Sequence, residues 1–169
     1  AMRRPNHAKG KSMDLILWRH AEAEELPETV TDAQADLARK LTPRGEKQAA
    51  RMADWLDRQL AGSTRILSSP ARRCEQTALA LGRKFKIRDE LAPGATPAEL
   101  LELVQWPLSK TPMLVIGHQP TLGQTLAVLL GLQESDCAIK KGAVWWLRTR
   151  VRDGEMQTVV VTVQSPEML

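Results

Sequence analysis

Short apolar runs alternate along the chain with longer segments that have helical periodicity. Each run is bounded by polar residues, which is typical of a buried strand. We therefore expect strands at residues 14–19, 64–68, 85–88 and 113–117. Helices are expected between them, the first starting at Pro43, the next running to about Leu81, and the others covering residues 97–104 and 120–130.

The last part of the chain has a different pattern. Residues 143–151 and 156–163 read as two strands joined by Asp153-Gly154, a pair typical of a hairpin turn. Alternating strands and helices that end in a hairpin predict a three-layer α/β/α sandwich over a mixed, mostly parallel central sheet. Residues 13–169 contain no internal repeat, and we interpret them as a single domain.

The net charge of +4 comes from the first residues of the 169-residue chain. Residues 1–13 hold four basic residues and no acidic one, namely Arg3, Arg4, Lys9 and Lys11. The other basic residues of the 24 in the chain balance its 20 acidic residues, so the remainder is neutral. We interpret residues 1–12 as a disordered basic leader or an extension added for expression, and we expect no nucleic-acid partner.

Cysteine and hydropathy patterns exclude further classes of protein. Cys74 and Cys137 belong to no C-x-x-C or Cys/His cluster, so we expect free thiols and no metal. No apolar segment has the length of a membrane span, and no signal-peptide core follows the N-terminal charges. These patterns predict a cytoplasmic protein without a membrane partner.

Three of the expected strands are followed by residues that suit phosphate chemistry. These residues are Arg19, His20, Arg73 and His118. Because ligand sites of open α/β sheets lie beyond the carboxyl ends of the strands, we expect them to lie together. Arginine offers a planar donor fork for phosphate oxygens, and histidine supplies a nucleophile or a proton carrier near neutral pH.

Prolines follow two of these strand ends, Pro70 after Ser69 and Pro120 after Gln119. We expect each proline to be the first residue of a helix, with Ser69 as an N-cap. A helix that starts at such a point would present free backbone N–H groups to an anion.

Several segments resemble, in the same order, the motifs of the histidine phosphatase superfamily. Residues 17–22 (LWRHAE) resemble its R-H-G motif, 41–45 (LTPRG) its L-T-x-x-G segment, 69–78 (SPARRCEQTA) its S-P-x-x-R-x-x-Q-T-A stretch, 115–120 (VIGHQP) its G-H-x-P motif and 142–145 (GAVW) the start of its late strand. The short chain is similar to the SixA branch, the phosphohistidine phosphatases. One departure is Ala21, which replaces a glycine and should be tolerated unless the backbone needs a positive φ.

The resemblance implies a phosphoglycerate-mutase-like fold and a covalent mechanism that needs no metal and no cofactor. His20 would attack phosphorus and form a phosphohistidine that water hydrolyses. Arg19 and Arg73 would hold the phosphoryl oxygens. His118 would donate a further hydrogen bond, in a protonated form that the anion favours. Arg72 is expected to be a solvated helix residue, because the arginine of the motif aligns with Arg73.

A general acid is not evident from the spacing of the carboxylates. The candidates are Glu22, Asp89, Glu90 and Glu99, and Glu22 opens an acidic loop that runs to Asp36. A phosphorylated imidazole needs little help, since it departs as neutral imidazole once its other nitrogen is protonated. We therefore expect a signalling phosphatase that acts on phosphohistidine in a protein of the histidine-phosphotransfer type. The alternatives are a phosphatase of small phosphorylated metabolites and a non-catalytic module that binds a phospholigand.

Overall fold

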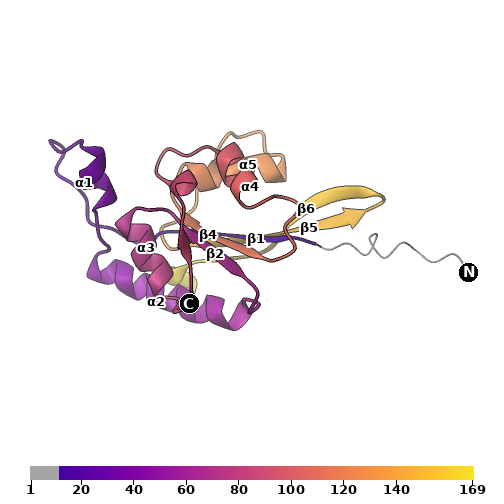
Figure 1. The fold of residues 1–169 in the computed structure, drawn as a ribbon, viewed down its shortest axis with the longest axis horizontal. Coiled ribbons are helices and arrows are strands. Elements are labelled where there is room, and N and C mark those ends of the chain that lie inside the picture. Colours follow the sequence, from indigo (N-terminus) through magenta and orange to yellow (C-terminus); the bar gives the residue numbers. More distant parts are fainter. Residues whose placement is uncertain (1–11) are drawn as a thin grey trace, which may run out of the picture.

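A six-stranded mixed sheet forms the centre of the protein in the computed structural model, which describes residues 12–169 (Figure 1). Its strands are β1 (Asp14–Arg19), β2 (Arg65–Ser68), β3 (Lys86–Ile87), β4 (Met113–Gly117), β5 (Val144–Arg152) and β6 (Glu155–Gln164). They lie in the order β3-β2-β4-β1-β5-β6, in which the first four run parallel and β5 is antiparallel to both neighbours. The expected mixed, mostly parallel sheet is confirmed. The predicted leader, residues 1–12, falls outside the described residues except for Ser12.

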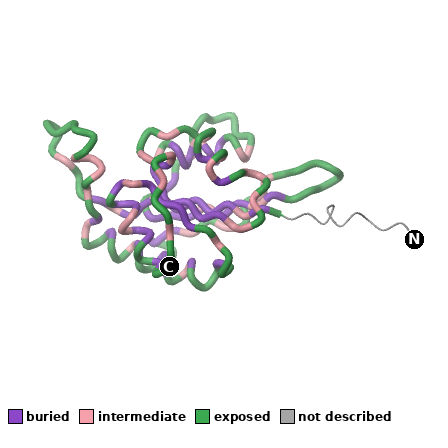
Figure 2. The backbone as a smooth tube through the Cα atoms, in the orientation of Figure 1, coloured by how far each residue is buried: buried purple, intermediate pink, exposed green. Residues whose placement is uncertain are grey.

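Helices cover both faces of this sheet and complete the three layers. They are α1 (Ala33–Leu37), α2 (Pro43–Gln59), α3 (Arg72–Leu79), α4 (Pro97–Leu103) and α5 (Thr121–Leu130), with short 3-10 helices η2 (Asp89–Leu91) and η3 (Pro166–Met168). The α2–α3 layer and the α4–α5 layer lie on opposite faces, and α1 stands apart at one end (Figure 1). The strands between the layers are the buried centre of the molecule (Figure 2).

β1 shows how the sequence divides the core between the two layers. Ile16 and Trp18 belong to the apolar cluster that includes α2 and α3, whereas Leu15 and Leu17 belong to the cluster that includes α4 and α5. Successive side chains of a strand point to opposite faces, so a strand covered on both sides is apolar at every position. The continuous run that predicted β1 is explained by this double burial.

The start of α2 agrees with the sequence, and the starts of two other helices do not. Thr42 caps α2 by accepting the Gly45 N–H at 2.9 Å, as its Thr-Pro pair predicts. In contrast, α3 starts two residues after Pro70, and α5 starts one residue after Pro120. The prediction that each proline is the first helical residue is therefore wrong.

The β5–β6 hairpin closes the sheet as expected. Asp153 and Gly154 form its turn with φ of 53° and 78°, values that suit these two residue types. The hairpin extends beyond the layers at the end of the molecule opposite α1 (Figure 1). Within residues 12–169, no helix has both the length and the apolar character needed to cross a membrane.

Candidate active site

The four predicted site residues meet at the carboxyl ends of three neighbouring parallel strands. Arg19 ends β1 and His20 follows it, while His118 follows β4 and Arg73 lies in the first turn of α3, just after β2. All four line one cavity of about 160 Å³. Its other lining residues are Ala23, Glu25, Arg39, Pro93, Gln119 and Lys141. The residues that the sequence predicted to lie together are thus adjacent in space.

His20 is buried, and a backbone carbonyl fixes the position of its ring proton. Its Nδ1–H donates to the carbonyl oxygen of Ala21 at 2.7 Å, so the lone pair at Nε2 stays free. Burial, reinforced by Arg73 and Arg19, lowers the pKa of His20 to about 3. The side chain is therefore a neutral imidazole at neutral pH, which is the form that a nucleophile needs.

His118 lies beside His20, with the two ring centroids 5.3 Å apart. Its Nδ1 accepts from Nη2 of Arg73 at 3.3 Å, because a guanidinium can only donate, and its Nε2–H then donates to Oγ of Ser69 at 2.7 Å. Burial, together with His20 and Arg73, lowers the pKa of His118 to about 3. The protein's own groups thus favour neutral His118, and the protonated form expected from the sequence requires the charge of a bound anion.

Arg19 and Arg73 are each anchored through terminal nitrogens. Nη1 of Arg19 donates to the Ile139 carbonyl at 2.6 Å, and Arg73 donates to the carbonyl and carboxylate of Asp36 at 2.7 and 3.2 Å. The Nε–H of each arginine is buried without an acceptor in residues 12–169. Buried donors without a partner are costly, so two of them at one cavity favour an anion there.

The start of α2 holds the segment that follows His20. The Thr42 N–H donates to the carbonyl of Glu22 at 3.1 Å, and the Thr42 hydroxyl donates to the Glu22 carboxylate at 2.7 Å. Gly45 lies so close to this segment that a Cβ on it would be 1.9 Å from the Glu22 carbonyl oxygen. The L-T-x-x-G segment therefore supplies a helix cap and a close backbone contact beside the cavity.

Ala21 occupies the position where the motif has glycine, and the backbone accepts it. Among residues 12–169, positive φ outside glycine occurs only at Gln105 and Asp153. Ala21 is fully buried, and its N–H donates to Oγ1 of Thr77 at 3.2 Å. The expectation that alanine is tolerated here is confirmed.

Comparison with known proteins identifies the family. The profile of the Histidine phosphatase superfamily (branch 1) matches residues 15–95. The chain is 31% identical over 135 residues to the phosphohistidine phosphatase SixA homolog of Haemophilus influenzae, and the aligned region covers 70% of this chain and 78% of that protein. The chain belongs to the histidine phosphatase superfamily.

Two further relatives place this histidine phosphatase near SixA. It is 32% identical over 125 residues to the phosphohistidine phosphatase SixA of Escherichia coli, covering 69% of this chain and 74% of that one. A structure of the protein histidine phosphatase SixA complexed with tungstate aligns with a TM-score of 0.69 at 26% identity, over 92% of this chain and 99% of that chain. The protein is therefore an enzyme, a SixA-like histidine phosphatase.

The carboxylates that the sequence offered as general acids do not line the cavity of this histidine phosphatase. They are Glu22, Asp89, Glu90 and Glu99. Glu22 is bound to Thr42, and Glu90 and Glu99 line a separate hollow. The cavity instead has Glu25 at its wall, an exposed residue of the acidic loop. Spacing could not distinguish Glu25, because acidic residues recur throughout that loop.

Ser69 and Cys74 are contacts of His118 that the sequence did not assign. Ser69 was predicted to cap α3, but the cap is Ala71, and the Ser69 hydroxyl fixes the His118 tautomer instead. Cys74 has its Sγ 3.4 Å from Nε2 of His118, and burial raises the pKa of this thiol to about 12. Cys74 is thus a packed thiol rather than a reactive one.

The start of α5 does not present the free N–H groups that the sequence predicted. The N–H groups of residues 122–124 donate to the His118 carbonyl, the Gln119 side chain and the Pro120 carbonyl. Side chains rather than this helix therefore supply the donors at the cavity. Within residues 12–169, no group of three His, Cys, Asp or Glu side chains is arranged to hold a metal ion.

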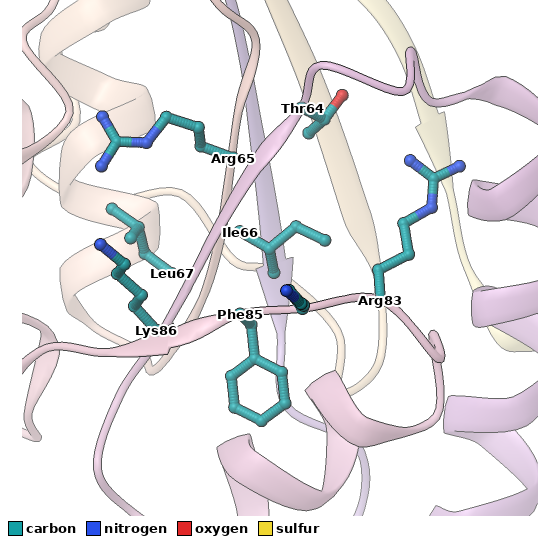
Figure 3. Close-up of a pocket in the computed structure, with 8 residues that line it drawn as sticks. Thr64, Arg65, Ile66, Leu67, Arg83, Phe85 and Lys86 are labelled. Carbon is teal, nitrogen blue, oxygen red and sulfur yellow. The ribbon is translucent and has the colours of Figure 1, made fainter.

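A larger cavity of about 530 Å³ lies at the β2–β3 edge of the sheet and differs in chemistry (Figure 3). It is lined by Thr64, Arg65, Ile66, Leu67, Arg83, Lys84, Phe85 and Lys86. Arg83 there is already bound by the Asp57 carboxylate at 2.9 Å. This cavity has no histidine and no carboxylate in its wall. The smaller cavity, where titratable groups converge, is therefore the better candidate for the active site.

Proposed function

We propose that His20 is the nucleophile of a covalent phosphatase reaction, that Arg19 and Arg73 hold the phosphoryl oxygens, and that His118 donates to the same group once the bound anion has favoured protonation of its Nδ1. The observation that carries this proposal is the set of free groups at one small cavity. These are the Nε2 lone pair of His20 and the two buried Nε–H donors. Electrophilic phosphorus and its anionic oxygens complement them. The related SixA bound to tungstate, an oxyanion, supports an oxyanion site.

The reaction has two steps that use the same histidine. Nε2 of His20 forms a bond to phosphorus while the bond to the leaving atom breaks, and the leaving group takes that electron pair. Because Nδ1–H remains bound to the Ala21 carbonyl, the phosphorylated ring is cationic and is itself a good leaving group. Water then attacks phosphorus, and inorganic phosphate and neutral His20 are released.

The substrate that fits best is phosphohistidine on a protein of the histidine-phosphotransfer type. The cavity volume of about 160 Å³ is below the roughly 300 Å³ at which small-molecule sites begin, so it suits a phosphoryl group whose carrier stays outside. An imidazole leaving group also places little demand on a general acid. The relatives named phosphohistidine phosphatases support this substrate class.

The roles of the site residues are tested by a set of matched variants. His20→Ala should abolish turnover and the acid-labile, base-stable phosphoenzyme that rapid quenching traps. Arg73→Ala should lower kcat/KM by at least about a hundredfold, the range for a lost donor to transition-state charge. Arg72→Ala is the control, since Arg72 is exposed whereas Arg73 is buried. Full turnover by the His20 variant, or a larger loss for Arg72 than for Arg73, would contradict the assignment.

A second candidate function is hydrolysis of small phosphate esters, and Glu25 is the observation that favours it. Its carboxyl group lines the cavity and could protonate an alcohol leaving group. The positive charges of the same wall would also attract anionic metabolites; they belong to Arg19, Arg73, Arg39 and Lys141. The acidic loop adds only Glu25 to this wall, so like-charge repulsion of such metabolites by that loop is confined to the rim.

A substrate panel separates the two functions. We expect kcat/KM for a phosphohistidine protein and for phosphoramidate to exceed that for an alkyl phosphate, with aryl phosphates between them. Glu25→Gln should leave phosphoramidate hydrolysis unchanged, as should the control Glu28→Gln in the same loop, which lies outside the cavity wall. Equal efficiency on the alkyl phosphate, lost selectively in Glu25→Gln, would move the enzyme to the ester class.

A further inference from the structure

Asp36, on α1, binds the guanidinium of Arg73 in two ways. Its backbone carbonyl accepts from Nη1 of Arg73 at 2.7 Å, and its carboxylate accepts from Nη2 at 3.2 Å. Both contacts lie on the edge of the guanidinium formed by the two terminal nitrogens. The opposite usable edge is formed by Nε–H and the second hydrogen of Nη2, and its Nε–H has no acceptor in the described chain. Asp36 therefore occupies one edge and leaves the Nε–H of the other edge without a partner.

The Nε–Nη2 edge of Arg73 faces His118. The second hydrogen of Nη2 is donated to Nδ1 of His118 at 3.3 Å, and Arg73, His118 and His20 line the same cavity. Protonation of His118 at Nδ1, which a bound anion favours, releases this Nη2–H, and the edge then offers two parallel N–H donors that match two oxygens of a phosphoryl group. The orientation of the arginine plane thus decides whether the phosphoryl group meets two donors or one.

Asp36 also holds a second cation of the cavity wall. Its other carboxylate oxygen accepts from Nε of Arg39 at 3.0 Å, and Nη1 of Arg39 donates to the Glu24 carbonyl at 3.0 Å. Burial opposes ionisation of Asp36, but Arg73 and Arg39 outweigh it and hold its pKa below the ordinary value. One ionised carboxylate therefore lies between two cations that would otherwise repel each other.

We propose that Asp36 is a positioning residue, which holds the terminal edge of Arg73 so that the Nε–Nη2 edge is presented to the phosphoryl group. This inference rests on the proposed role of Arg73 as a phosphoryl ligand. Asp36 itself does not touch the reacting atoms. It acts by limiting the orientations of the guanidinium before substrate arrives, which lowers the cost of ordering that side chain on binding.

The test is a double-mutant cycle between Asp36 and Arg73, read out by the Kd of inorganic phosphate and by kcat/KM. Asp36→Ala should weaken phosphate binding and lower kcat/KM by about tenfold to a hundredfold, the range for a misplaced catalytic contact. In the Arg73→Ala background the same substitution should change neither quantity by more than about twofold, because coupled residues are not additive.

Asp57→Asn is the matched control, because it breaks a comparable ion pair with Arg83 away from the cavity. It should retain wild-type phosphate affinity. Thermal unfolding checks that each variant folds, and the partly exposed side chain of Asp36 makes a stable fold the expected result.

Three outcomes would overturn the inference. The first is that Asp36→Ala has the same phosphate Kd and kcat/KM as Asp57→Asn, and the second is that Asp36→Ala changes these quantities as much in the Arg73→Ala background as in the wild type. The third is tighter phosphate binding by Asp36→Ala, which would make Asp36 a competitor of the anion. Failure of the proposed function gives a different result, namely wild-type phosphate affinity and kcat/KM in Arg73→Ala alone.

Discussion

At the scale of single residues, the proposed phosphate site is built around two neutral imidazoles. Burial is the main reason that His20 and His118 each have a pKa of about 3, and the arginines beside them add to it. Each ring has one proton with a fixed acceptor, the Ala21 carbonyl for His20 and the Ser69 hydroxyl for His118. The positive charge for the anion therefore comes from the guanidinium groups, and His20 keeps its lone pair.

Low histidine pKa values make the stability of the fold depend on pH. Between the ordinary pKa of 6.5 and about 3, the unfolded chain binds a proton at each histidine and the folded chain does not. The free energy of unfolding therefore rises with pH in this window and falls as the pH drops below about 6.5. Each histidine contributes a slope of at most about 1.4 kcal/mol per pH unit.

Urea unfolding at several pH values from 5 to 7 measures this slope, in a range where carboxylates remain largely ionised. His118→Gln removes one of the two groups, so its unfolding free energy should vary less with pH than that of the wild type. Identical slopes in the two proteins would show that folding does not lower the pKa of His118.

The positions of candidate site residues were predictable where a polar residue directly follows an apolar strand. Arg19, His20 and His118 follow apolar runs, and those runs reveal where the chain reaches the edge of the sheet. Asp36 was not predictable as a contact of Arg73, because it is one of several acids in a segment that has no apolar periodicity and that the sequence predicted as a loop. Its role depends on a long-range approach of α1 to α3, which local pattern does not encode.

At the scale of elements, the start of α2 is built as a support for the segment after His20. The Thr42 hydroxyl accepts from the helix and donates to Glu22, so one side chain joins the two elements. Gly45 lets the helix approach the Glu22 backbone more closely than any other residue type would. The contact at Glu22 thus couples the position of α2 to His20, the cavity residue two positions before Glu22.

Gly45→Ala tests this support, and the substitution has two opposite effects on stability. Helix propensity alone would favour alanine by roughly 0.5–1 kcal/mol. The new Cβ would meet the Glu22 carbonyl oxygen at 1.9 Å, and relieving that clash costs about 1–3 kcal/mol. We therefore expect lower stability in urea unfolding, together with a lower kcat/KM because the displaced segment adjoins Ala21 and His20.

Gly62→Ala is the matched control, since a Cβ at Gly62 would meet nothing within 4 Å. It should be neutral or slightly stabilising. Equal effects of the two substitutions would show that the backbone at Glu22 yields without cost.

The sequence located these elements well and misplaced the starts of two helices. A proline after a capping residue marks a helix start only approximately. The Ser69 hydroxyl accepts the Ala71 N–H at 3.2 Å and also binds His118, and α3 starts after Ala71. At α5 the Gln119 side chain accepts the Gly123 N–H, a role that glutamine rarely signals.

At the scale of the whole molecule, the class of fold followed from alternation of strands and helices, but the strand order did not. β1 lies between parallel β4 and antiparallel β5, which join it from distant parts of the chain. These pairings bring Arg19, His118 and Arg73 to one edge, and no local pattern specifies which strands become neighbours. The resemblance to family motifs could predict one common site, because the family already has a fold in which these strands are neighbours.

The β5–β6 hairpin gives the molecule an attachment point far from the cavity. Its turn, Asp153 and Gly154, is exposed, and the hairpin lies at the end opposite α1 (Figure 1), whereas Asp36 of α1 contacts Arg73 in the cavity wall. Exposed turns of this kind accept inserted residues with little effect on the rest of a domain. A tether or fluorophore attached there would hold the enzyme by its far end, so that on a sensor surface the cavity would face the solution.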